Sequence, residues 1–165
     1  MERFVRRYIY FLLAGITYLI IHEGVHIIQA QIFGIYEGIL LRPLGIEVII
    51  TQPIKIGDFK LAMFSGLSSV VTVLIGYILF VSSHKILKSN NQPVKNYIYY
   101  VTFVFLLLDP IYISLVSFVV GGDINGIALG LNIPYMFVRG ICFIIAVFNT
   151  YLVYNKLYPA YVIKQ

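Results

Sequence analysis

Three residues near the N-terminus carry the clearest chemistry in the chain: His22, Glu23 and His26 form an H-E-x-x-H pattern. On an α-helix the two histidines are one turn apart on the same face, so both imidazoles can bind one metal ion. Glu23 is rotated by one residue from His22, where its carboxylate can act on a metal-bound water without displacing it. The pattern predicts a zinc site with Glu23 as the general base.

The residues around this pattern are almost entirely apolar. The apolar run extends from about residue 8 to residue 33, and Glu23 is its single formally charged residue. A helix of that length can cross a bilayer core of ~30 Å. Ionisable groups at such depth cost roughly 2.5–3.5 kcal/mol each, so they are rarely retained without a function. The alternatives are a coincidental motif or histidines that are merely satisfied in a protein core.

One face of this predicted helix collects its small and polar residues. Helical spacing places Gly15, Tyr18, His22, His26 and Gln29 on that face, while the other positions are mostly Ile, Leu, Val and Phe. A polar stripe on a helix in a membrane must face other helices, because lipid offers it no hydrogen-bond partner. The metal site is therefore expected inside a bundle.

The composition predicts an integral membrane protein of one domain, residues 1–165. The chain is 60% hydrophobic and 12% charged, against roughly 25% charged in ordinary soluble domains, and its mean hydropathy is +0.90. The net charge of +5 does not indicate nucleic acid, because the basic residues flank apolar spans and suit contacts with anionic lipid. The single Cys142 excludes an internal disulfide.

Four apolar stretches are long enough to span a membrane, at about 8–33, 59–83, 97–120 and 134–154. We expect an all-α integral membrane protein of about four transmembrane helices, the first a retained span because it is too long for a signal peptide. Eight Lys and Arg residues against three predict that both termini are cytoplasmic in a multi-pass protein of the cell membrane. The eight are Arg3, Arg6, Arg7, Lys85, Lys88, Lys95, Lys156 and Lys164; the three are Arg42, Lys55 and Lys60.

The connection after the first span predicts a small β-hairpin. Segments 35–41 and 46–52 are rich in β-branched and large apolar residues, and Arg42-Pro43-Leu44-Gly45 between them suits a turn. We expect this hairpin at the membrane surface, where its free edge could pair with an extended peptide. A plain solvated loop is the alternative.

A catalytic zinc needs a third protein ligand and an open position for water. Counting 1.5 Å per residue along straight upright helices places the H-E-x-x-H centre ~24 Å into the bundle, Asp109 ~18 Å and Asp123 ~39 Å. Asp109 is therefore nearer, and a carboxylate in mid-membrane needs a cation. Asp123 is the second candidate, although it could instead be a turn residue or a partner of Arg139. Pro110 is expected to free a backbone carbonyl beside Asp109.

These motifs resemble those of the site-2 protease family of intramembrane zinc metalloproteases. The resemblance covers roughly residues 8–125 and rests on His22-Glu23-Gly24-Val25-His26 and on Leu108-Asp109-Pro110 two spans later. It implies a zinc cofactor, proteolysis of membrane proteins or peptides, and Asp109 as the third ligand.

The chain departs from that family at two positions. Pro110 follows the aspartate where Gly is usual, and the second-span motif has Gly66-Leu67 in place of Gly-Pro. The segment from Gly122-Asp123 to Ile133-Pro134 is similar to the end of some small relatives, which keeps Asp123 as an alternative ligand. The expected function is intramembrane zinc endopeptidase. The alternatives are an inactive membrane scaffold that keeps a structural metal and a transporter with a His and Asp relay.

Overall fold

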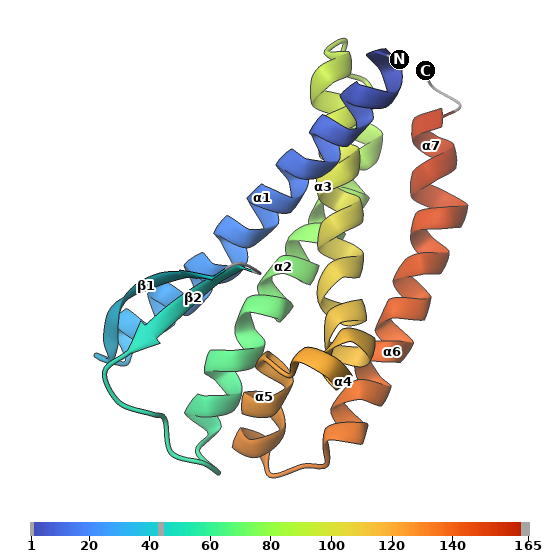
Figure 1. Cartoon of the computed structure of the whole chain (residues 1–165). Helices are drawn as coiled ribbons and strands as arrows, with labels where there is room; N and C mark the ends of the chain where they lie inside the picture. Colours follow the sequence, from blue (N-terminus) through green and yellow to red (C-terminus); the bar gives the residue numbers. More distant parts are fainter. Residues whose placement is uncertain (1, 43–44, 163–165) are drawn as a thin grey trace.

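The computed structural model describes residues 2–42 and 45–162, so Pro43 and Leu44 of the expected turn and Lys164 lie outside the described residues. Figure 1 shows the first helix slanted beside the other long helical segments, with both termini at the same end. The elements in chain order are α1 (Glu2–Ile32), β1 (Tyr36–Arg42), β2 (Gly45–Ile50), α2 (Phe59–Ile86), α3 (Gln92–Ile111), the π-helical η1 (Tyr112–Val116), α4 (Ser117–Val120), α5 (Asp123–Leu131), α6 (Tyr135–Leu152), the π-helical η2 (Val153–Leu157) and α7 (Tyr158–Val162).

The structure confirms the predicted fold class. Four helical segments are long and apolar enough to cross a membrane, and they cover Phe4–Ile32, Phe59–Ile86, Gln92–Val120 and Tyr135–Tyr161. Large apolar side chains face outward, for example Ile20, Ile78 and Ile144, which are 62%, 63% and 69% exposed. The interior instead holds many of the polar side chains. This distribution suits a protein whose surroundings are hydrocarbon.

The predicted hairpin is present and lies along α1 (Figure 1). β1 and β2 pair antiparallel, from Tyr36 opposite Ile50 to Arg42 opposite Gly45, with an irregularity between Tyr36 and Gly38. The Thr51 N–H donates to the Ile35 carbonyl at 2.8 Å and closes the open end of the hairpin. β2 packs against α1 and lines a cavity together with His22, Glu23 and His26 of that helix.

Small residues bring α2 and α5 close together. A stripe of small residues on α2 is buried, including Ser65, Ser69, Thr72 and Gly76. Gly126 and Gly130 of α5 face this stripe, and a Cβ on Gly130 would lie 2.9 Å from the Cα of Ala62. Close backbone approach through small residues replaces the hydrophobic effect as the basis of helix packing in lipid.

The proline in α3 is compensated by a side chain from α6. Pro110 has no N–H, so the carbonyl of Leu106, four residues earlier, lacks its helical donor. The buried Asn149 amide donates to that carbonyl at 2.6 Å, and the Tyr77 hydroxyl donates to the Asn149 Oδ1 at 2.6 Å. One polar chain therefore links α2, α6 and α3 and satisfies the carbonyl that the proline exposes.

Replacing Asn149 by Leu should lower the free energy of unfolding by about 1 kcal/mol, because the buried Leu106 carbonyl loses its donor. Adding Pro110→Ala to this variant should recover much of the loss, since residue 110 then supplies an N–H. Unfolding in detergent micelles measures both effects. Asn155→Leu, at an exposed asparagine, is the control, and a double variant no more stable than Asn149→Leu would contradict the explanation.

Candidate metal centre

Three side chains from two distant segments converge on one point. His22 and His26 of α1 and Asp123, the first residue of α5, offer ligand atoms that all lie within 4.8 Å of one another. Asp123 Oδ2 is 3.2 Å from His22 Nε2, and Asp123 Oδ1 is 3.7 Å from His26 Nε2. The two histidines are buried, and Asp123 is partly exposed. This group could hold a metal ion.

The donor set fits zinc. Two imidazole nitrogens and one carboxylate oxygen are a known set of protein ligands for catalytic zinc, with a fourth position left for water. Ligand atoms at zinc–ligand distances of about 2.0–2.2 Å in a tetrahedron are separated by roughly 3.3–3.6 Å. The two separations between Asp123 and the histidines, 3.2 and 3.7 Å, are close to this range, and all three ligand atoms lie within 4.8 Å of one another.

Glu23 borders the same cavity as these ligands. The cavity has a volume of about 440 Å³, and its lining includes Tyr18, His22, Glu23, His26, Tyr112 and Asp123. Ile46, Glu47 and Val48 of β2 form another part of its wall. Glu23 is half-buried, as its position one residue beyond His22 on α1 requires. The arrangement places a carboxylate beside a potential metal site and next to β2, whose second edge pairs with no strand of the described sheet.

Asp123 reaches the histidines because the chain turns sharply before it. Gly121 and Gly122 have φ of +73° and +91°, a region that favours glycine. The Tyr112 hydroxyl donates to the Gly121 carbonyl at 3.1 Å, and a Cβ on Gly122 would collide with that hydroxyl. In Figure 1, α4 leaves the direction of α3 and leads across to α5. The assumption of a straight upright span therefore overestimated the distance to Asp123.

Asp109, the preferred ligand from the sequence, lies behind His22 instead of within the ligand group. Its Oδ1 is 3.4 Å from His22 Nδ1, the ring nitrogen on the other side from the Nε2 that faces Asp123. The carboxylate is 1% exposed. It accepts hydrogen bonds from the Tyr18 hydroxyl at 2.5 Å, from Ser69 Oγ at 3.0 Å and from Thr72 Oγ1.

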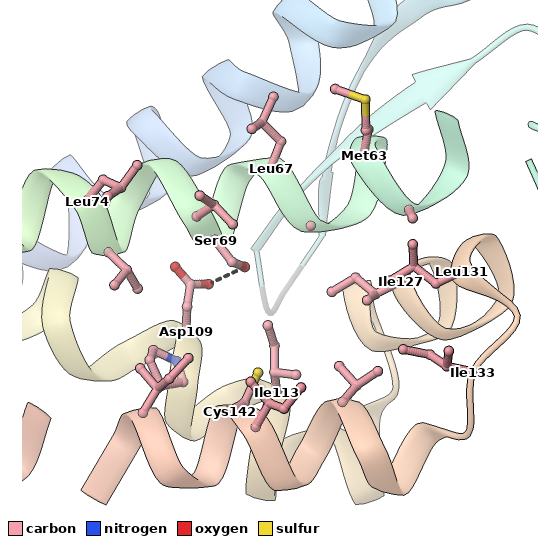
Figure 2. Close-up of a pocket in the computed structure, with 18 of the residues that line it drawn as sticks. Met63, Leu67, Ser69, Leu74, Asp109, Ile113, Ile127, Leu131, Ile133 and Cys142 are labelled. Atoms are coloured by element: carbon pink, nitrogen blue, oxygen red, sulfur yellow. Dashed lines mark hydrogen bonds between the residues drawn. The ribbon is translucent and has the colours of Figure 1, made fainter. Parts of the chain in front are cut away.

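The far side of Asp109 faces a second cavity, of about 660 Å³ (Figure 2). Figure 2 shows Asp109 hydrogen-bonded to Ser69 at the edge of this space, while the other labelled lining residues are aliphatic, Met63 or Cys142. The apolar side chains of this cavity provide almost no hydrogen-bond donors for the Asp109 carboxylate. The hydroxyls of α1 and α2 therefore have to satisfy it.

Sequence reasoning missed these hydroxyl partners. The spacing of Ser69 and Thr72 on their helix suits packing residues, and it does not distinguish a hydrogen-bond donor to a carboxylate from a small contact residue. Tyr18 carried a usable signal, because it precedes His22 by one helical turn on the same face.

Arg139 contacts Ser117 and Phe118 in the structure instead of the suggested partner Asp123. Arg139 Nε donates to Ser117 Oγ and its Nη2 to the Ser117 carbonyl, each at 3.3 Å. Its guanidinium carbon lies 3.8 Å from the centre of the Phe118 ring. Arg139 therefore links α6 to α4 at the end of the third span, and Asp123 faces the histidines.

This chain matches no protein-family model, no curated protein and no solved structure. The resemblance to the site-2 protease family therefore rests on the sequence motifs, and the ligand that it implies, Asp109, lies outside the group of His22, His26 and Asp123.

Asp123→Ala should weaken zinc binding by about 100-fold, since structural sites with four protein ligands bind zinc with roughly 10–16 kcal/mol, which is about 3 kcal/mol for each ligand lost. Competition with a chromophoric chelator on purified protein measures the affinity. Glu37→Ala, which removes an exposed carboxylate on β1, is the matched control. Equal zinc affinity in Asp123→Ala and the control would exclude Asp123 as a ligand.

Proposed function

We propose that this protein is a zinc endopeptidase that hydrolyses peptide bonds of membrane proteins or membrane-bound peptides within or beside the bilayer. The observation that supports this most directly is the shared cavity of His22, His26, Asp123 and Glu23. Two histidines and an aspartate can hold a metal ion, and a separate glutamate beside them can act as the general base. This combination is typical of metal-dependent peptide hydrolysis.

His22, His26 and Asp123 would hold the metal in this proposal. When bound, zinc supplies a Lewis acid that polarises the scissile carbonyl and activates a water molecule. Glu23 would take a proton from that water and pass it to the departing amine, since it borders the cavity without belonging to the group of three ligands. The surrounding helices would keep bulk solvent away from the reacting peptide.

The substrate would be bound in an extended form. A helical segment hides its carbonyl groups in internal hydrogen bonds, so it must unwind before hydrolysis. Ile46, Glu47 and Val48 of β2 line the cavity, and the described sheet has two strands, in which β2 pairs with β1 along one edge. Addition of a substrate strand to the other edge would place its backbone next to Glu23.

Glu23→Gln should retain zinc and lose proteolysis, because glutamine preserves the size of the side chain but cannot accept the proton. Mass spectrometry of a single-span model peptide incubated with the zinc-loaded protein in vesicles would show the difference. The control is Glu47→Gln, a second carboxylate of the same cavity wall, which should still cleave. Cleavage by Glu23→Gln at the wild-type rate would refute the mechanism.

Both termini would face the cytoplasm, since the basic residues are concentrated at their end of the bundle. On a Cys142→Ala background, Ser89→Cys between α2 and α3 should react with a membrane-impermeant thiol reagent from the cytoplasmic side. Gln52→Cys, in the connection between β2 and α2, should react from the opposite side. The reverse pattern of labelling would invert the proposed orientation.

A further inference from the structure

The two histidines of the metal centre have different surroundings at their second ring nitrogens. His22 Nδ1 lies 3.1 Å from the Tyr18 hydroxyl. His26 Nδ1 is buried and has no hydrogen-bond partner among the described residues. A zinc-binding histidine usually donates its second ring N–H to a fixed acceptor, which sets the tautomer and the direction of the ring. Of the two, His22 has such a contact.

The direction of the hydrogen bonds at Tyr18 follows from its single proton. The Tyr18 hydroxyl is 2.5 Å from Asp109 Oδ1, and an ionised carboxylate can accept but not donate. The one hydroxyl proton is therefore directed to Asp109. At the 3.1 Å contact the tyrosine oxygen must then accept, which places the donating N–H on His22 Nδ1.

Asp109 is itself held in place by residues that do not touch His22. Thr72 Oγ1 donates to Oδ2, and Ser69 Oγ donates to Oδ1 at 3.0 Å. Thr72 and Asp109 are 0% and 1% exposed. Since the carboxylate is fixed by α2, the orientation of Tyr18 is fixed too, and with it the orientation of the His22 ring.

We infer that Asp109 and Tyr18 are positioning residues, which keep the proton of His22 on Nδ1 and thereby leave the Nε2 lone pair directed at the metal. The chain of hydrogen bonds runs from His22 Nδ1–H to the Tyr18 oxygen and from the Tyr18 O–H to Asp109. Asp109 in this arrangement acts through His22 and is not a ligand. The inference rests on the metal site of the proposed function but not on its proteolytic activity.

Zinc affinity and stoichiometry of the purified protein test this assignment. Tyr18→Phe and Asp109→Asn should each weaken zinc binding about 10–100-fold, the usual effect of losing an outer hydrogen-bond partner, while zinc at saturation stays at one ion per chain. Tyr77→Phe, which deletes a buried hydroxyl bonded to Asn149 away from the metal, is the matched control and should leave the affinity unchanged. Tyr18→Phe keeps the test decisive if Asp109→Asn does not fold.

Two further measurements distinguish a role of Tyr18 and Asp109 in positioning His22 from a general role in protein stability. The Tyr18→Phe, Asp109→Asn double variant should bind zinc little worse than the weaker single variant, because both changes interrupt the same chain of hydrogen bonds. In zinc-loaded protein with ¹⁵N-labelled histidine, the Nδ1 proton of His22 should exchange slowly with water in the wild type and faster in Tyr18→Phe. His22→Gln assigns that signal among the three histidines of the chain.

Unchanged zinc affinity in both single variants, with unchanged proton exchange, would overturn the inference. So would loss of zinc in Asp109→Asn to the level of His22→Ala with zinc retained in Asp123→Ala, because Asp109 would then be the ligand. A protein that shows the expected affinities and exchange rates but cleaves no peptide would contradict the proposed function alone.

Discussion

The buried carboxylate of Asp109 is the constraint on which the centre of this bundle depends. An ionised side chain at 1% exposure is strongly unfavourable in an apolar interior unless hydrogen bonds compensate it. Here the donors come from α1 through Tyr18 and from α2 through Ser69 and Thr72, while Asp109 itself belongs to α3. The requirement to satisfy one carboxylate thus fixes three helices relative to one another at the level of His22.

Close packing of α2 against α5 positions Asp123, the residue that α5 contributes to the candidate metal centre. Gly126 and Gly130 leave room for Ser65 and Ala62, so α5 lies directly against α2. The turn at Gly121 and Gly122 then aims Asp123 at the histidines. A bulkier residue in either place would displace Asp123, because an added Cβ would collide with atoms that already lie against these glycines. The geometry of the candidate metal centre therefore depends on these small residues as well as on His22, His26 and Asp123.

The two cavities of the bundle differ in the polarity of the side chains that line them. The cavity lined by Glu23 and Asp123 borders β2 and has several polar groups in its wall, whereas the larger cavity beside Asp109 is almost wholly apolar. Asp109 lines that apolar space together with Ser69 and also contacts His22, so its carboxylate lies between the two. The candidate metal centre therefore has a polar cavity on the Asp123 side of His22 and an apolar cavity beyond Asp109.

The sequence by itself determined the features that local patterns encode. Hydrophobic runs predicted the four spans, β-branched segments with a Pro and Gly turn predicted the hairpin, and the spacing of His22, Glu23 and His26 placed all three on one stretch of helix. The tertiary structure decided which aspartate joins the histidines. Rise per residue along straight helices favoured Asp109, but the tilt of α1 and the glycine turn before α5 bring Asp123 to the Nε2 atoms and leave Asp109 behind the ring. Helix tilt and turn direction arise from packing between distant segments, and residue spacing within one segment does not encode them.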